Sequence, residues 1–240
     1  MTGSRVQENL ERVRERIDTA CARAGRTPRS VKLVAVSKRI PLPLLVDVCQ
    51  AGQWDLGENR VQDALDRQAE LSVALTEAGL PTDRVVWHFI GHLQGNKVGR
   101  VGGNFDLLHG VDSVKLAQRL SRTAEEGNRT ERILLEVNIS REKQKHGFTP
   151  EEVVEAAANI GALPGLELGG LMGMGRFGAT ETELRKTFAS LRELAGAARK
   201  FSGLSLPELS MGMSGDFEEA IAEGSTLIRV GGAIFGERSV

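Results

Sequence analysis

VKLVAVSK (residues 31–38) is an almost continuously apolar segment that is rich in β-branched residues and ends in a lysine. Such a run is typical of a strand covered on both faces, as in a parallel sheet. Comparable segments recur along the chain, and helical patterns separate them. The seven further predicted strands are 54–59, 85–91, 106–112, 132–140, 166–175, 206–213 and 226–236.

Eight strands that alternate with helices, with no linker or low-complexity stretch between them, predict an α/β fold. We expect a single (β/α)8 TIM barrel that forms one domain over residues 1–240, an ordinary length for this architecture. The main alternative is an open, doubly wound sheet. An extra amphipathic helix precedes the first strand and stops at Gly25; its predicted apolar stripe is Val6, Leu10, Val13, Ile17, Cys21 and Ala24.

Two later helices have recognisable start signals. Thr149 and Glu152 have the spacing of a capping box, with Pro150 at the first helical position. Thr180 and Glu183 form a second such pair. The buried stripe expected after the second pair is Leu184, Phe188, Leu191, Leu194 and Phe201.

Composition and charge narrow the class of protein. With 31 basic and 32 acidic residues the net charge is −1, so no overall field attracts nucleic acid or an anionic membrane. The N-terminal segment is too charged for a signal peptide, and no apolar run approaches membrane-spanning length. Cys21 and Cys49 lack metal-type spacing and are expected to be free and buried. We therefore expect a cytoplasmic protein, monomeric because no exposed apolar stripe is evident.

The site of a (β/α)8 barrel lies at the carboxyl ends of its strands, and phosphate groups commonly bind after strands seven and eight. Here both loops are glycine-rich and supply Ser214, Gly215, Gly231 and Gly232. Glycines let backbone N–H groups approach an anion closely. Tight turns, with Ser214 or Asp216 as a helix N-cap, are the simpler interpretation of either loop alone. Both loops together, at the expected positions, favour a phosphate site.

Lys38 and Arg229 are the charged residues that stand out in strand patterns. A lysine in partly desolvated surroundings has a lowered pKa, and its free amine can attack an aldehyde. Judged alone, Lys38 would be a solvated lysine at a strand end; the predicted phosphate site makes a reactive amine competitive. Arg229 could pair with a carboxylate or face the ring nitrogen of a bound pyridine.

Other patterns carry less weight. Residues 173–178 match GxGxxG, but no acidic residue ends a strand about 20 residues further on, as a dinucleotide site requires. The four histidines, His88, His92, His109 and His146, are scattered without metal-type spacing, so no metal site is expected.

The chain resembles the pyridoxal phosphate homeostasis proteins over nearly its whole length. The segments that carry the resemblance are AVSK (35–38), GENRVQ (57–62), WHFIG followed by LQ and NK (87–97), VDS (111–113), LEVNIS (135–140), KHGF (145–148), GLMGM (170–174), LSMGMSGDFEEAI (209–221) and STLIRVGGAIFGER (225–238). His92 and Gly95 depart from the proline and serine of many relatives, which puts the shape of the third loop in doubt.

The resemblance implies a barrel like the N-terminal domain of alanine racemase, with pyridoxal 5′-phosphate (PLP) held as a Schiff base on Lys38. It implies that Ser214, Gly215, Gly231 and Gly232 lie near the phosphate, Arg229 at the pyridine nitrogen and Asn59 beside the cofactor. It also implies a role in vitamin B6 homeostasis without an established catalytic activity, with PLP-dependent apoenzymes as possible recipients.

Two alternatives stay open: a PLP-dependent enzyme of the amino-acid racemase type, and a PLP-sensing regulatory protein. Related racemases use a tyrosine from a second domain as a base, whereas this chain contains no tyrosine and is expected to end with the barrel. His88 and His109 are the least unsuitable candidates for a second base, and neither has an orienting partner evident in the sequence.

Overall fold

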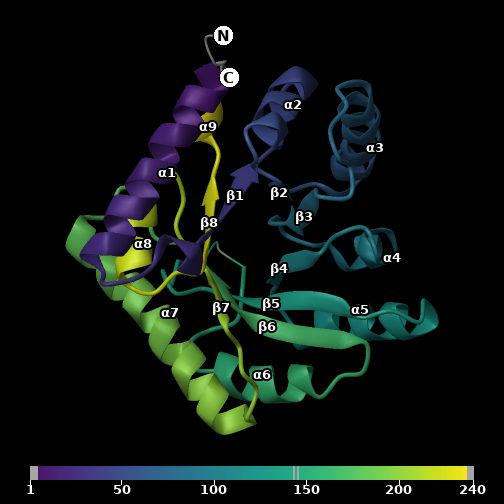
Figure 1. The fold of residues 1–240 in the computed structure, drawn as a ribbon. Helices are drawn as coiled ribbons and strands as arrows, with labels where there is room; N and C mark the ends of the chain where they lie inside the picture. Colours follow the sequence, from purple (N-terminus) through teal and green to yellow (C-terminus); the bar gives the residue numbers. More distant parts are fainter. Residues whose placement is uncertain (1–4, 143, 145, 237–240) are drawn as a thin grey trace.

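The computed structural model describes residues 5–142, 144 and 146–236; the outer ends of the predicted domain and Lys145 of the KHGF segment lie outside this part. Eight parallel strands form a closed barrel in sequence order, with β8 paired to β1 (Figure 1). The expected (β/α)8 barrel is therefore confirmed. Its strands are β1 (Lys32–Val36), β2 (Asp55–Glu58), β3 (Val86–Phe89), β4 (Leu107–Val111), β5 (Glu131–Val137), β6 (Leu166–Gly173), β7 (Glu208–Ser210) and β8 (Leu227–Val230).

Helices follow the strands on the outside of the barrel. They are α2 (Leu42–Gln50), α3 (Val61–Glu77), α4 (Val98–Val101), α5 (Val114–Glu126), α6 (Val153–Gly161), α7 (Glu181–Ser202), α8 (Phe217–Ala222) and α9 (Gly232–Phe235), with short 3₁₀ turns at Pro28–Ser30 and Gly95–Lys97. No helix among the described residues combines the length and apolar character needed to cross a membrane.

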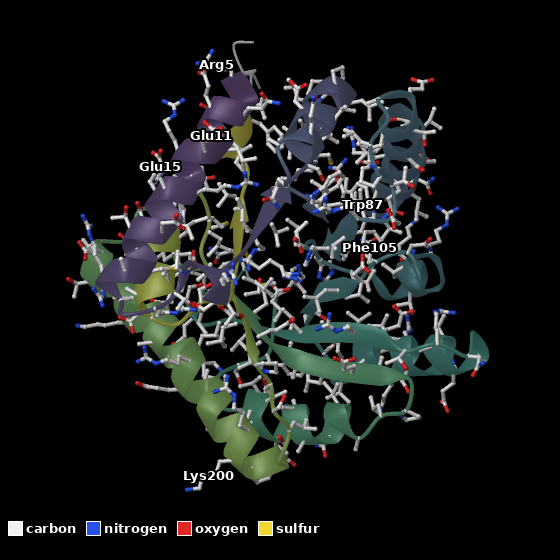
Figure 2. All side chains as sticks on the ribbon, viewed as in Figure 1. Arg5, Glu11, Glu15, Trp87, Phe105 and Lys200 are labelled. Atoms are coloured by element: carbon white, nitrogen blue, oxygen red, sulfur yellow. The ribbon has the colours of Figure 1, made fainter. Side chains whose placement is uncertain are left out.

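The extra N-terminal helix α1 (Arg5–Arg23) contacts α8 and α9 and runs alongside them (Figure 1). Five of its predicted apolar positions are buried, whereas Ala24 lies just beyond the helix and is half-buried. Arg5, Glu11 and Glu15 are exposed and project from its outer side (Figure 2). The apolar face of α1 thus covers the outside of the barrel beside α8 and α9, which are both short.

Two interior layers of side chains follow from the two-residue period of the strands. The first layer is apolar and consists of Val34, Leu107, Leu134, Met172 and Leu227. Two residues further along β4, β5 and β8 come His109, Glu136 and Arg229, all of them buried. The barrel therefore has a polar layer closer to the carboxyl ends of its strands.

One of the two predicted capping boxes is complete. At the start of α7 the Thr180 N–H donates to the Glu183 carboxylate (2.8 Å) and the Glu183 N–H to the Thr180 hydroxyl (3.4 Å). At Thr149 only the first of these bonds forms, because the Glu152 N–H donates to the Thr149 carbonyl oxygen instead. Residues 150–152 form a turn, and α6 begins later than predicted.

The predicted apolar stripe of α7 was wrong at its end. Phe201 is 64% exposed, while the stripe continues through Ala195 and Ala198. At 3.6 residues per turn, Phe201 lies about 100° around the helix from Leu184. Cys21 and Cys49 are free and buried, as expected.

Candidate functional site

Lys38 lies in a tight turn directly after β1. The Ile40 N–H donates to the Ser37 carbonyl oxygen (3.0 Å), so Lys38 and Arg39 are the two central residues of the turn. Arg39 has a φ of 59°, a left-handed conformation that few residues other than glycine adopt. The Ser37 hydroxyl donates to the Glu58 carboxylate (2.7 Å) at the end of β2, which fixes the start of the turn.

Asn59 is adjacent to Lys38 in space. Both residues line a cavity of about 210 Å³ at the carboxyl ends of β1 and β2. The turn after β3 packs directly on the Asn59 backbone, since a Cβ at Gly91 would lie 2.2 Å from the Asn59 carbonyl oxygen. The structure therefore brings together these two residues, which the resemblance assigned to one cofactor.

The loops after β7 and β8 also meet. The Ser214 hydroxyl accepts hydrogen bonds from the N–H groups of Gly231 (3.3 Å) and Ala233 (3.4 Å). Gly232 lies beside the same hydroxyl, and Gly215 lines a cavity of about 590 Å³ together with Ser214. Two backbone donors thus converge on one hydroxyl next to an open cavity, an arrangement suited to an anion.

Asp216 precedes α8, but its carboxylate does not cap that helix. It accepts from the Met213 N–H (2.6 Å) and so closes the loop that carries Ser214 and Gly215. Burial raises the pKa of Asp216, while the Met213 N–H and the nearby Arg229 guanidinium oppose this shift. Asp216 therefore does not cap α8 through its side chain. Its carboxylate instead forms a hydrogen bond within the loop.

Arg229 is a buried cation inside the barrel. Its guanidinium donates to the Ser210 hydroxyl (2.5 Å) and to the Gly173 carbonyl oxygen (3.2 Å). Burial lowers the pKa of Arg229 to about 10, and the charges of Asp216 and Glu136 partly offset this effect. Arg229 is thus still protonated at neutral pH.

A chain of hydrogen bonds crosses the barrel from Arg229. His109 Nδ1 lies 2.8 Å from the Ser210 hydroxyl, His109 Nε2 lies 3.0 Å from His88 Nδ1, and His88 Nε2 lies 3.0 Å from Asp55 Oδ1. A guanidinium only donates and a carboxylate only accepts. Arg229 is therefore the donor end of this chain and Asp55 its acceptor end, with Ser210, His109 and His88 between them.

The far end of this chain lies at the amino ends of the strands. Lys32, at the start of β1, is 3.4 Å from the Asp55 carboxylate. Burial opposes ionisation of Asp55, but hydrogen bonds and charge from His88 and Lys32 outweigh it and lower the pKa of Asp55. The chain thus links a buried cation at one end of the barrel to an ionised carboxylate at the other.

The orienting partners of His88 and His109 were not found from the sequence. Asp55 and Ser210 are those partners, and Ser210 is 101 residues away from His109. The sequence did offer one indication of these contacts. Polar residues stand at inward-facing positions of strands whose other inward-facing residues are apolar. Sequence alone does not show which inward-facing residues meet across a barrel.

We expect His109 to contribute a pH dependence to stability. Burial, His88 and Arg229 hold the pKa of His109 well below its ordinary 6.5. Below pH 6.5 His109 takes up a proton in the unfolded chain but not in the folded chain. The folded state is therefore not weakened by this residue above pH 6.5, and it loses stability as the pH falls below that value. The free energy of unfolding should decrease by up to about 1.4 kcal/mol per pH unit from this residue.

Chemical denaturation of wild type and of His109→Gln, between about pH 6.5 and pH 5, checks this prediction. The variant keeps a hydrogen-bonding side chain but lacks the titrating ring, so its stability should depend less steeply on pH. Equal slopes in the two proteins would show that His109 does not contribute.

The two candidate cavities lie on either side of β8. Lys38 and Asn59 line the first, and Ser214 and Gly215 line the second. Strand β8, with Arg229, pairs with β1 on one side and with β7 on the other. The GxGxxG stretch begins at the last residue of β6, and its residues 174–178 line the second cavity. The closed barrel leaves no open sheet for a dinucleotide fold.

These features define a (β/α)8-barrel protein with a lysine after β1 and an anion-suited pair of loops after β7 and β8. The profile of the family "Alanine racemase, N-terminal domain" matches residues 8–239. Among curated proteins, the chain is 42% identical over 235 residues to the pyridoxal phosphate homeostasis protein of Pseudomonas aeruginosa, covering 98% of this chain and 96% of the relative. The corresponding Escherichia coli protein is 39% identical, with 97% of each chain covered.

A solved structure of PipY from Synechococcus elongatus with PLP bound is 37% identical, with a TM-score of 0.82, and covers 96% of this chain and 100% of that one. The chain therefore belongs to the family of pyridoxal phosphate homeostasis proteins.

Proposed function

We propose that this protein binds PLP as a Schiff base on Lys38 and carries or buffers the cofactor in vitamin B6 homeostasis. The observation that carries the proposal is the placement of Lys38 and of the Ser214 loop on either side of β8. PLP needs an amine for its aldehyde and donors for its phosphate, and this rim supplies both. Family membership and the PLP-bound PipY structure support the same conclusion.

Each candidate residue has a role in this proposal. The N–H groups and hydroxyl around Ser214, Gly215, Gly231 and Gly232 bind the phosphate, and Asn59 lies beside the cofactor near Lys38. Arg229 faces the pyridine nitrogen. When bound, PLP supplies an electron-withdrawing ring, and a permanent cation at its nitrogen keeps that nitrogen unprotonated and the ring a weaker electron sink.

A carrier fits the described residues better than a racemase does. A racemase needs a second base that reaches its substrate, and the 240 residues contain no tyrosine. His88 and His109 are buried, and both ring nitrogens of each are hydrogen-bonded within the barrel. We therefore propose that the protein is not catalytic and hands PLP to apoenzymes. We also propose that it is a single barrel domain, monomeric and cytoplasmic.

The test is to add PLP to the purified protein, record the visible spectrum, reduce with borohydride and map the modified peptide. A band that disappears on reduction, with the added mass on Lys38, supports the proposal. Labelling scattered over exposed lysines such as Lys200 would overturn it.

Loss of the Ser214 hydroxyl should weaken PLP binding through the phosphate. We expect Ser214→Ala to lower the affinity for PLP by about 10-fold to 150-fold, because a hydrogen bond to a charged group contributes about 1.5–3 kcal/mol. Binding of pyridoxal, which has no phosphate, should not change. Spectral titration of wild type, Ser214→Ala and Ser72→Ala, which removes an exposed hydroxyl on α3, measures both affinities. An equal loss for both ligands would argue against a phosphate at Ser214.

A further inference from the structure

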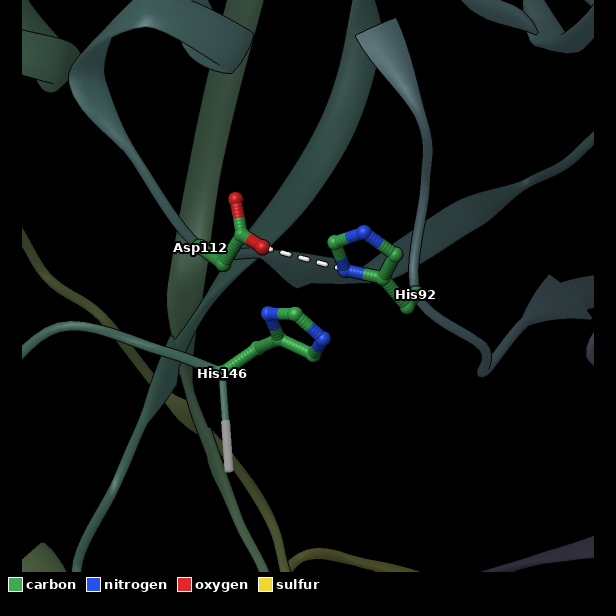
Figure 3. Close-up of side chains that lie close together, drawn as sticks. All are labelled: His92, Asp112 and His146. Carbon is green, nitrogen blue, oxygen red and sulfur yellow. Dashed lines mark ion pairs between the residues drawn. The ribbon is translucent and has the colours of Figure 1, made fainter. Parts of the chain in front are cut away.

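His92, Asp112 and His146 come together at the carboxyl ends of neighbouring strands (Figure 3). His92 Nδ1 is 3.1 Å from Asp112 Oδ2, and the two imidazole rings are stacked with centroids 4.0 Å apart and planes at 18°. One ligand atom from each residue lies within 4.8 Å of the other two. Two of the histidines that were scattered in the sequence are therefore neighbours in the fold.

Glycines bring the loops of β3 and β4 close enough for the first contact. A Cβ at Gly110 would lie 2.5 Å from the Gly91 carbonyl oxygen, so any other residue there would force the two strand ends apart. His92 follows Gly91, and Asp112 follows the last residue of β4. The His92–Asp112 pair is thus built on closely packed strand ends rather than on long loops.

The loop after β5 is held in place beside this pair. Phe148 pairs with β5: its N–H donates to the Glu136 carbonyl oxygen (2.8 Å), and its carbonyl oxygen accepts from the Asn138 N–H (2.9 Å). Gly147 has a φ of 112°, and a Cβ there would lie 2.8 Å from the Glu136 carbonyl oxygen. This glycine allows the chain to turn back onto β5, which brings His146 over His92.

We propose that His92, Asp112 and His146 bind a divalent transition-metal ion of the Zn²⁺ type at the rim of the barrel. Two imidazole nitrogens and one carboxylate oxygen suit Zn²⁺, whereas Mg²⁺ and Ca²⁺ prefer oxygen ligands. An imidazole lone pair lies in the plane of its ring, so the exposed His146 ring would turn out of its stack on His92 when it binds the ion. Three protein ligands leave a coordination position for water or a small anion. His92 is 41% exposed, so the ion can enter and leave from solvent.

The metal site does not share residues with the proposed PLP site. Its ligands follow β3, β4 and β5, whereas the proposed PLP residues lie on or after β1, β2, β7 and β8. A bound ion would join three rim loops, and it would hold the His146 segment against the strand ends. Zn²⁺ should therefore raise the midpoint of thermal unfolding, whether or not PLP is bound.

Calorimetric titration of the full, untagged and PLP-free chain with Zn²⁺ tests the site. We expect one ion per chain, bound at least about tenfold more weakly by Asp112→Asn and by His146→Phe. The phenylalanine keeps an aromatic ring that can stack on His92 but has no ligand atom, so it separates metal binding from ring packing. Glu126→Gln, which removes an exposed carboxylate on α5, should bind Zn²⁺ as wild type does.

A second readout uses Co²⁺ in place of Zn²⁺. The visible absorption of the bound Co²⁺ should be present in wild type and lost in His146→Phe. Absence of saturable binding, or Zn²⁺ affinity unchanged in both ligand variants, would overturn the proposal. The cluster would then be a hydrogen-bonded His92–Asp112 pair on which the His146 ring stacks, without a metal. Zn²⁺ binding that persists in Lys38→Ala would show that the metal site is independent of the proposed PLP site.

Discussion

Lys38→Ala should abolish the visible absorption band that added PLP gives with the wild-type protein. A Schiff base requires a primary amine, and alanine removes the one amine placed at the end of β1 beside Asn59. PLP can still contact the Ser214 loop through its phosphate, so weak binding without the band is the expected residual behaviour. Absorption spectroscopy before and after gel filtration separates loss of the covalent bond from loss of all binding.

Two matched variants make this result interpretable. Lys38→Arg keeps the positive charge but cannot form a stable imine with PLP, so it should also lack the band. Lys200→Ala removes an exposed amine at the end of α7 (Figure 2) and should behave as wild type. An unchanged band in Lys38→Ala would assign the Schiff base to another lysine and would end the Lys38 proposal.

The barrel was predictable because its strands are covered on both faces. Buried parallel strands such as VKLVAVSK (31–38) are apolar on both sides and stand out against the amphipathic helices. The prediction was wrong at the end of the last strand, 226–236, because the apolar residues of the short helix α9 continue the pattern of β8. Local chemistry also located the start of α7, where Thr180 and Glu183 cap each other. The capping-box pattern at Thr149 predicted the start of α6 too early. The Glu152 N–H can donate to the side chain or to the main chain of Thr149, and it donates to the main-chain carbonyl oxygen.

The sequence predicted the positions of candidate site residues only where the fold itself dictates position. Lys38, Ser214 and Gly231 lie in loops that follow β1, β7 and β8, and all strands of a barrel end at the same rim. The polar contacts inside and around the barrel depend on which residues meet across it. Ser210 with His109, and His92 with His146, are pairs that no local pattern connects, so they emerge only in three dimensions.

Arg229→Glu should change both the stability of the barrel and the state of the bound cofactor. The new carboxylate would be buried near Glu136 and Asp216, and it could no longer donate to Ser210. Leaving a buried charge without its partner typically costs about 3–5 kcal/mol of unfolding free energy. A carboxylate at the pyridine nitrogen favours its protonation, so the affinity for PLP or the visible spectrum should change with pH in a way that wild type does not show.

Arg229→Gln keeps this prediction testable if the glutamate variant does not fold. Glutamine is neutral and retains a donor for Ser210, so it should destabilise the barrel less while still removing the cation from the ring. Denaturation curves measure the first effect, and PLP titrations followed by absorption at several pH values measure the second. If both variants lose stability but bind PLP with an unchanged affinity and spectrum, Arg229 holds the interior chain to Asp55 together and does not face the cofactor. A spectral change in Arg229→Gln, at near-normal stability, instead ties the buried cation directly to the electronic state of PLP.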